Sequence, residues 1–184
     1  MTSREGKPRI RPVSDPDAEQ SELLSKTLLT DNGRPLNLFA TLAHNPKLLK
    51  RFNALGGFFL RHGALPARER ELVILRVAAR TGSTYEYAQH LVIGGRVGLS
   101  TEESERTRGP LDAWTGDDRT LMQFVDEMID SDGAAVSTWD TLAERFGNDQ
   151  LLELALLVGF YRMLAAFLIV VGVEVEDELQ SPSP

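Results

Sequence analysis

The stretch LPARERELVILRVAARTGSTYEYAQHLVIGGRVGLS, residues 65–100, contains two helical patterns separated by a turn, and these two helices organise the rest of the chain. Residues 66–80 form an amphipathic pattern with a narrow polar face of Glu69, Arg76 and Arg80. Glu71 lies near the middle of the apolar arc, where burying a carboxylate is costly unless it is paired. We therefore predict that Glu71 faces inward and has a partner.

A second helix is predicted over residues 84–97, with Ser83 as its N-cap. This helix places Glu86 and His90 one turn apart, with Tyr87 on the same face as His90. The carboxyl groups of Glu71 and Glu86 and the imidazole of His90 are therefore predicted to face the interior from two consecutive helices. Tyr87 either hydrogen-bonds a ligand or fills the core, which is the commoner outcome for a helical aromatic.

His90 is the strongest candidate for chemistry. A histidine on an apolar helix face is more often a satisfied core residue, but Glu86 and Glu71 favour a functional role here. Burial and a neighbouring carboxylate act on an imidazole in opposite directions near neutral pH, where proton transfer is useful. Glu86 either orients and charges His90 or forms only an i,i+4 pair that supports the helix.

The rest of the chain predicts an all-α fold of about nine helices, with no convincing strand. Residues 1–13 are polar and without a period, so we expect a flexible N-terminal arm. Residues 14–175 form one predicted domain, whose first helix starts at Ser14 and runs to about Leu29. Residues 176–184 form a predicted disordered acidic, proline-ended tail.

One apolar stretch, residues 154–173, has the length of a membrane span but carries Arg162 in its middle. We therefore predict a buried core helix, which can also serve as an oligomer seam. Arg162 either pairs with Glu71 or anchors a substrate carboxylate through its bidentate fork.

Composition excludes several classes of function. The 184 residues include no cysteine, so thiolate chemistry and zinc-thiolate sites are excluded. The net charge of −7 argues against general nucleic-acid binding. The three histidines show no metal-ligand spacing, so no metal is predicted. The N-terminus has no apolar segment typical of a signal peptide, and we expect a cytoplasmic protein that does not bind membranes.

These residues resemble the carboxymuconolactone decarboxylase family, which includes the AhpD-like alkylhydroperoxidases. In the redox branch a helix glutamate precedes a CxxC pair and a histidine, and these positions match Glu71, Ser83, Glu86 and His90. The decarboxylase branch tends to carry a tyrosine-glutamate-aromatic run before the histidine. Here that run reads YEYAQH over residues 85–90.

The resemblance implies an AhpD-like helical fold assembled as trimers or larger rings such as hexamers. It also implies a cofactor-free lyase or isomerase that acts on a small carboxylated lactone or a related enol-forming acid. His90 would move the proton, with Glu86 and Glu71 setting its tautomer and charge. The remaining substrate-binding candidates are Tyr87, Arg162 and Ser83, although an N-cap role explains Ser83 most simply.

Two other classes remain open. An AhpD-like peroxidase is disfavoured because the chain lacks the CxxC pair that this mechanism needs. A non-catalytic oligomeric scaffold or ligand-binding protein would keep the fold without turnover. Under that hypothesis, replacing His90 changes stability alone.

Overall fold

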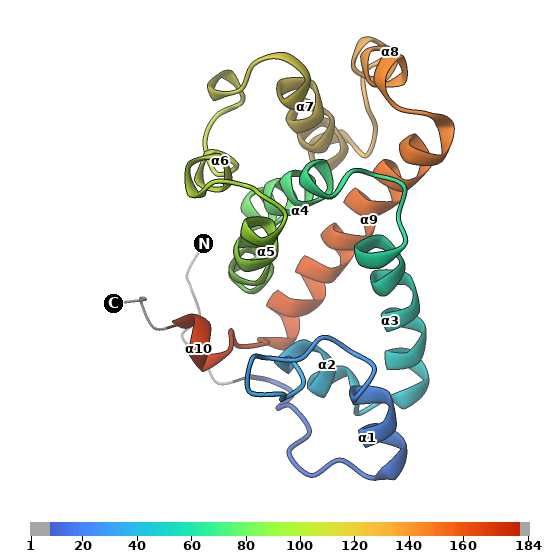
Figure 1. The fold of residues 1–184 in the computed structure, drawn as a ribbon, viewed down its shortest axis with the longest axis vertical. Helices are drawn as coiled ribbons and strands as arrows, with labels where there is room; N and C mark the ends of the chain where they lie inside the picture. Colours follow the sequence, from blue (N-terminus) through green and yellow to red (C-terminus); the bar gives the residue numbers. More distant parts are fainter. Residues whose placement is uncertain (1–7, 181–184) are drawn as a thin grey trace. The chain divides into compact units, whose positions relative to one another are not determined.

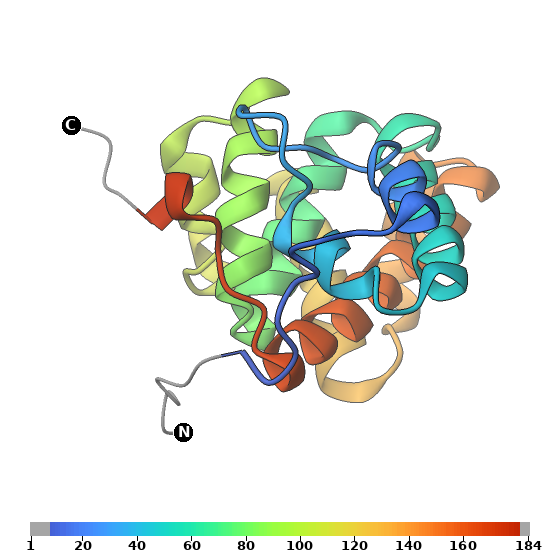
Figure 2. The same ribbon diagram turned by 90° about the horizontal axis from the view of Figure 1, so that it is seen from below.

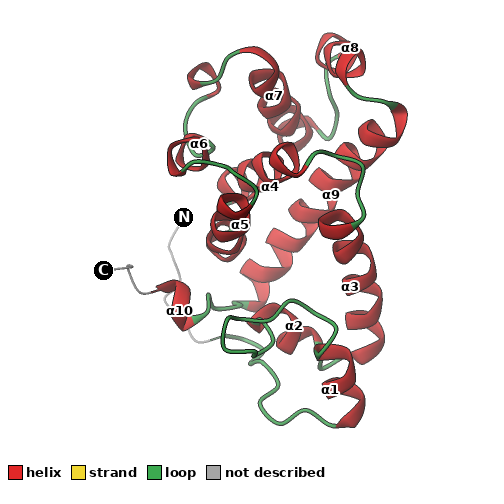
Figure 3. Cartoon of the chain, viewed as in Figure 1, coloured by secondary structure: helices red, strands yellow, loops and turns green. Residues whose placement is uncertain are grey.

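The computed structural model describes residues 8–180, and over this range the chain folds into ten α-helices and one 3-10 turn, without a β-strand (Figures 1 and 3). The helices are α1 (Ala18–Leu24), α2 (Asn37–Leu42), α3 (Pro46–Arg61), α4 (Ala67–Thr81), α5 (Thr84–Arg96), α6 (Thr101–Arg106), α7 (Gly116–Ser131), α8 (Val136–Arg145), α9 (Asn148–Val171) and α10 (Asp177–Gln180), with the 3-10 turn η1 at Leu111–Ala113. The predicted all-α class is confirmed.

The structure differs from the predicted helices at both ends of the chain. The first helix begins at Ala18 rather than at Ser14, because Asp17 and Gln20 form a reciprocal capping box at its start. It ends at Leu24, and the hydroxyl of Thr27 donates to the Leu24 carbonyl at 2.7 Å. The extra helix α10 lies where a disordered tail was predicted. Residues 1–7 and 181–184, which belong to the predicted arm and tail, lie outside the described residues.

The chain divides into two compact units. The terminal unit contains residues 1–58 and 167–184, and the central unit contains residues 59–166. Helices α1, α2 and α10 belong to the terminal unit, and α4 to α8 belong to the central unit. The predicted motif helices therefore both lie in the central unit.

In the terminal unit, the two ends of the described chain are held by hydrogen bonds. The Arg9 N–H donates to the Val171 carbonyl at 2.8 Å, and Figure 2 shows the start of the chain beside the segment that follows α9. Glu176 accepts from the backbone N–H of Asn37 at 2.7 Å, at the start of α2. These bonds give the described parts of the predicted arm and tail defined positions.

In the central unit, α4 packs against both α5 and α7 (Figure 1). Its apolar side chains at positions 72–75 are fully buried. Arg76, on the face predicted to be polar, is also buried. Its guanidinium donates hydrogen bonds to both carboxylate oxygens of Asp126 and to the carbonyls of Thr107 and Gly109. A bidentate pair of this kind satisfies a charge that burial would otherwise penalise.

Helix α9 is the one helix among the described residues that is long and apolar enough to cross a membrane by length and composition. Half of its most apolar window is buried inside the protein, so the predicted core helix is buried on one side and exposed on the other. The helix carries Tyr161 on a buried face and Met163 on an exposed one.

Candidate active site

A tight turn between α4 and α5 sets the geometry of the site. Gly82 ends α4 with a left-handed conformation, φ 73°, which favours glycine because a Cβ is strained there. Ser83 is the N-cap residue of α5, as predicted, but its hydroxyl makes no capping hydrogen bond. The chain therefore reverses within two residues, and α4 and α5 lie side by side (Figure 1).

The two helices bring together the predicted glutamate and histidine. Nδ1 of His90 lies 2.6 Å from Oε2 of Glu71. Glu71 is fully buried and His90 is buried. An ionised carboxylate only accepts, so Nδ1 carries the hydrogen and Nε2 is left as the basic nitrogen of the neutral ring. Nε2 has no hydrogen-bond partner within residues 8–180.

Arg70 completes this pair and was not predicted. Its Nε donates to Oε1 of Glu71 at 2.9 Å, and its side chain is 10% exposed. Burial raises the pKa of Glu71, but the charges and hydrogen bonds of His90 and Arg70 outweigh it, and the net pKa lies below the usual range. The prediction of a paired, inward Glu71 is confirmed, with Arg70 as the arginine.

The other predicted partner of Glu71 lies elsewhere. Arg162 forms an ion pair with Asp132, and its side chain is 42% exposed. The pairing of Arg162 with Glu71 is therefore wrong. Side chains of adjacent helix residues do not normally face each other. Helix spacing therefore does not predict the contact between Arg70 and Glu71.

Tyr161, one residue before Arg162, is the part of α9 that reaches the site. Its ring meets the His90 ring edge-on, with centroids 5.1 Å apart and planes at 87°. Burial, followed by the charges of Glu71 and Glu86, raises the pKa of the Tyr161 hydroxyl well above its usual range. The ring therefore stays neutral and fixes one side of His90. The only sequence signal for it was an aromatic residue inside a buried apolar helix.

Glu86 has a different environment from Glu71. It is 2% exposed, and neither carboxylate oxygen has a hydrogen-bond partner among the described residues. Burial raises the pKa of Glu86 to about 8, and the nearby Ser83 hydroxyl opposes this only in part. At neutral pH the carboxyl is therefore mostly protonated. The predicted i,i+4 pair of Glu86 with His90 is not formed, and Glu71 takes that role.

The remaining predicted site residues divide into two groups. Ser83 is buried beside Glu86, and its hydroxyl also has no hydrogen-bond partner in the described part of the chain. Tyr87 instead donates its hydroxyl to the Ser104 carbonyl at 2.7 Å, with the Arg108 guanidinium over its ring at 3.7 Å. Tyr87 thus joins α5 to the region of α6, in the core role that was the alternative to ligand binding.

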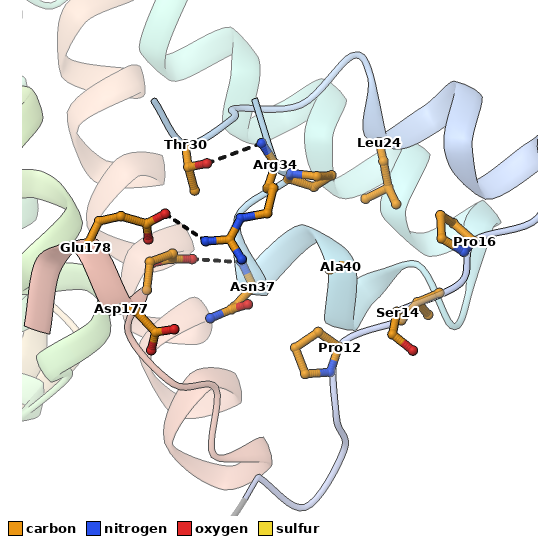
Figure 4. A pocket seen from close by; sticks show the side chains of 13 residues that line it. Pro12, Ser14, Pro16, Leu24, Thr30, Arg34, Asn37, Ala40, Asp177 and Glu178 are labelled. Atoms are coloured by element: carbon orange, nitrogen blue, oxygen red, sulfur yellow. Dashed lines mark hydrogen bonds and ion pairs between the residues drawn. The ribbon is translucent and has the colours of Figure 1, made fainter. Parts of the chain in front are cut away.

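A separate cavity of about 440 Å³ lies within the terminal unit. Figure 4 shows Arg34 in its wall, where the guanidinium pairs with Glu178 at 2.7 Å. Because this cation already has a carboxylate partner, the cavity offers less chemistry than the residues around His90. Within the described residues, no group of three or more His, Cys, Asp or Glu side chains is placed to hold a metal ion.

The helices that carry the candidate site lie within a region of the chain that matches a protein-family model. Residues 46–124 match the model described as "Carboxymuconolactone decarboxylase family". The predicted family resemblance is confirmed. The match contains α4 and α5 with Glu71, Glu86 and His90, and Tyr161 lies beyond it.

Solved structures with the same fold extend the likeness over nearly the whole chain. An uncharacterized peroxidase-related protein from Silicibacter sp. TM1040 is 16% identical, with a TM-score of 0.82 and coverage of 98% of each chain. The debrominase Bmp8 is 16% identical, with a TM-score of 0.76 and coverage of 93% of this chain and 94% of that one. A protein from Ralstonia eutropha JMP134, described as an alkylhydroperoxidase AhpD core, is 18% identical, with a TM-score of 0.74 and coverage of 97% and 100%.

These identities are low, so the structural matches show an AhpD-like fold and no particular activity. No curated protein matches the chain.

Proposed function

We propose that the protein is a cofactor-free lyase or isomerase, similar to carboxymuconolactone decarboxylase, acting on a small carboxylated lactone or a related enol-forming acid. The observation that carries the proposal is the buried Glu71–His90 pair, which leaves Nε2 of His90 as a base without a protein partner among the described residues. The family match over residues 46–124 supports the same class of reaction.

In this proposal His90 moves a proton at carbon. Glu71 accepts the Nδ1 hydrogen of His90 and fixes the tautomer, so that Nε2 can remove a proton next to a carbonyl group. The imidazolium that forms is stabilised by the Glu71 carboxylate, which Arg70 keeps ionised. The proton then returns to the same carbon or, in an isomerisation, to a conjugated one.

Glu86 would serve as the acid. With a pKa of about 8 it holds a proton at neutral pH and can donate it to carbon or to an enolate oxygen. In a decarboxylation, the bond between the substrate carbon and its carboxylate breaks and CO₂ leaves. The electron pair enters the conjugated carbonyl, and the resulting enolate takes one proton at carbon.

Arg70 is the candidate that would hold a substrate carboxylate retained in the product. Its Nε is bound to Glu71, while its two terminal nitrogens have no protein partner in residues 8–180. This assignment replaces Arg162, whose guanidinium is bound to Asp132. A planar guanidinium suits a carboxylate because it offers two parallel donors.

A thiol peroxidase function has less support. Two of the similar structures are described as peroxidase-related, but this chain has no cysteine to attack a peroxide. Ser83 and Glu86 stand where the resemblance places the cysteines. A carboxyl group and a hydroxyl group transfer protons and do not form the disulfide that such a mechanism requires.

The test is CO₂ release from a panel of small unsaturated lactones that carry one or two carboxylates. We expect turnover by the wild type, a loss of roughly 100-fold or more in kcat for His90→Gln, and a raised KM for Arg70→Lys. His62→Gln is the matched control, because His62 is exposed and outside the site. Absence of turnover on the whole panel, or an active His90→Gln variant, would count against the proposal.

A further inference from the structure

Two buried polar groups at the candidate site have no protein partner. The carboxyl group of Glu86 is on a side chain that is 2% exposed, and neither of its oxygens is hydrogen-bonded within residues 8–180. Tyr161 is 3% exposed, and its hydroxyl also makes no hydrogen bond to the described chain. Buried polar groups are nearly always hydrogen-bonded in folded proteins. Two unpaired groups in one site indicate a ligand atom that both can bind.

Aromatic packing holds Tyr161 beside His90. The Tyr161 ring meets the His90 ring edge-on, with centroids 5.1 Å apart, and meets the Phe160 ring with centroids 5.4 Å apart. The Tyr161 hydroxyl lies close enough to Glu71 and Glu86 for the charges of both to raise its pKa. Because the ring is packed on these sides, its hydroxyl stays close to the groups that the proposed reaction uses.

A role in core packing alone explains this tyrosine less well. A buried tyrosine hydroxyl usually finds a hydrogen-bond partner. Tyr87 follows that rule, because its hydroxyl donates to the Ser104 carbonyl at 2.7 Å. At position 161 a phenylalanine would fill the same space against His90 without burying an unpaired hydroxyl. The Tyr161 hydroxyl is therefore available for a ligand.

Both unpaired groups are neutral hydrogen-bond donors near neutral pH. Burial raises the pKa of Glu86 to about 8 and the pKa of Tyr161 well above its usual range, so each group keeps its proton. Fixed donors of this kind stabilise an oxygen atom that gains negative charge during a reaction. A tyrosine hydroxyl and a neutral carboxyl group form such an oxyanion site together in some isomerases.

We propose that the Tyr161 hydroxyl and the Glu86 carboxyl group together bind the carbonyl oxygen of the substrate and stabilise it as an enolate. The inference rests on the proposed function, since it names the groups that receive the charge when His90 removes a proton from carbon. Nε2 takes the proton, the C–H electron pair forms a carbon–carbon double bond, and the C=O electrons move to oxygen. Tyr161 and Glu86 keep their protons in this step. The enolate left by loss of CO₂ carries its charge on the same oxygen.

The donors of the site then differ in charge, and this difference specifies the substrate. Arg70 is a cation and suits a carboxylate, whereas Tyr161 and Glu86 are neutral and suit a ketone or lactone carbonyl. The Glu71 carboxylate is paired with Arg70, so its charge does not stand alone beside the developing enolate. The expected substrate has a carboxylate and a separate carbonyl group whose enolate is conjugated.

The first test measures binding of 4-nitrophenol near neutral pH, where the phenol is partly ionised and its phenolate absorbs visible light. The phenolate imitates an enolate oxygen, and it carries no carboxylate that would need Arg70. Donors directed at the oxygen stabilise the phenolate, so we expect the visible absorbance to rise as wild-type protein is added. An apolar pocket without donors would favour the neutral phenol and lower the absorbance.

Tyr161→Phe keeps the ring against His90 and removes the hydroxyl alone. We expect its affinity for the phenolate to fall roughly 10-fold or more, and its affinity for 4-nitroanisole, which cannot ionise, to stay unchanged. Tyr87→Phe is the matched control, because it removes a hydroxyl that is bound to the Ser104 carbonyl, and it should bind the phenolate like the wild type. Circular dichroism melts of each variant confirm that the chain is folded.

Two substitutions of Glu86 test the second donor. Glu86→Gln keeps an N–H donor at this position and should bind the phenolate within about 3-fold of the wild type. Glu86→Leu has no donor and should bind it roughly 10-fold or more weakly. Phenolate binding by Glu86→Leu at the wild-type affinity would overturn the shared site.

Binding and turnover together separate this inference from the proposed function. His90→Gln should lose turnover and still bind the phenolate, because both donors remain. If no lactone is a substrate but the phenolate binds through Tyr161, the oxyanion site stands and the proposed function fails. If the wild type turns over a lactone, Tyr161→Phe should lower kcat by roughly 100-fold. An unchanged kcat in that variant would leave the proposed function standing and overturn the oxyanion site.

The absorbance titration gives the remaining results that would overturn the inference. One is a fall in absorbance, or no change, when wild-type protein is added to 4-nitrophenol. Another is equal affinity of the wild type and a folded Tyr161→Phe for the phenolate.

Discussion

Glu71 and Glu86 are two buried carboxyl groups whose pKa values move in opposite directions. Burial acts on both, but Glu71 has His90 and Arg70 as partners, and its pKa falls. Glu86 has only the weak influence of Ser83, and its pKa rises to about 8. One group is thus an ionised acceptor and the other a neutral donor at the same pH. Such a separation assigns acid and base roles in enzymes.

Glu86→Gln should flatten the dependence of stability on pH. Between about pH 4.5 and about pH 8 the unfolded chain releases the Glu86 proton while the folded chain keeps it. The folded state then binds more protons, so its stability falls as pH rises through this window, by about 1.4 kcal/mol per pH unit at most. Glutamine does not titrate and removes this loss.

The measurement is urea denaturation of wild type and Glu86→Gln at intervals from about pH 5 to about pH 8, the window set by the pKa shift. Glu102→Gln serves as the control, because the Glu102 side chain is 84% exposed. Equal pH slopes for wild type and Glu86→Gln would show that Glu86 is ionised in the folded protein.

Glu71→Gln should destabilise the protein strongly. It removes the carboxylate that pairs with both Arg70 and His90 and leaves a buried guanidinium without its counter-charge. We expect a loss of about 3–5 kcal/mol in the free energy of unfolding, the range typical of a broken buried ion pair. Chemical denaturation near neutral pH measures it.

A double-mutant cycle separates this pairing from a simple packing loss. Glu71→Gln combined with Arg70→Gln should cost less than the sum of the two single changes, because each single change leaves the other charge unpaired. Strict additivity would mean that Arg70 and Glu71 do not interact.

At the residue scale, the sequence correctly predicts that Glu71 faces the interior. It does not predict all the side chains that contact Glu71 and His90. Glu71 was placed inward because it interrupts an apolar arc, and the structure confirms this. Its partner Arg70 and the aromatic neighbour Tyr161 were missed. The first lies directly before Glu71, at i−1, where helix geometry predicts no contact, and the second comes from 90 residues further along the chain.

At the element scale, the turn that joins α4 to α5 depends on Gly82. Gly82→Ala places a Cβ at φ 73°, and no atom lies within 4 Å of it, so the effect is conformational strain alone. We expect a loss of about 1 kcal/mol in stability. The site should loosen with it, because this turn fixes α5 against α4.

Gly95→Ala is the matched control for this turn. Gly95 lies inside α5 without a positive φ, and its Cβ would also meet no atom within 4 Å. Alanine is favoured over glycine in a helix, so the free energy of unfolding should rise by about 0.5–1 kcal/mol. Thermal melts of both variants decide the matter, and a stabilising Gly82→Ala would contradict the role of the turn.

Local signals explain why most helices could be predicted. Ser100 and Glu103 have the spacing of a capping box, and this capping box is present at the start of α6 in the structure. The start of α1 was misplaced because Ser14 and Asp17 are both suitable caps, and Gln20 decides between them by bonding back to Asp17. Helix α10 lacks an apolar period, and its region is held by Glu176 and Glu178, contacts that span more than a hundred residues.

At the scale of the whole molecule, the fold is shared with proteins that are only 16–18% identical, over almost the full chain. The periodicity of apolar residues is enough to specify such a helical arrangement, while residues 46–124 match the model of the carboxymuconolactone decarboxylase family. The candidate residues Glu71, Glu86 and His90 lie inside this matched region, and Tyr161 lies outside it.

The proposed function requires that His90 transfers protons at carbon. The most direct test is deuterium incorporation from D₂O into an unsaturated carboxylated lactone, followed by proton NMR with wild type, His90→Gln and the control His62→Gln. We predict exchange at the carbon next to the carbonyl with wild type and His62→Gln, and a loss of roughly 100-fold or more with a folded His90→Gln. Equal exchange rates for wild type and His90→Gln would contradict the claim.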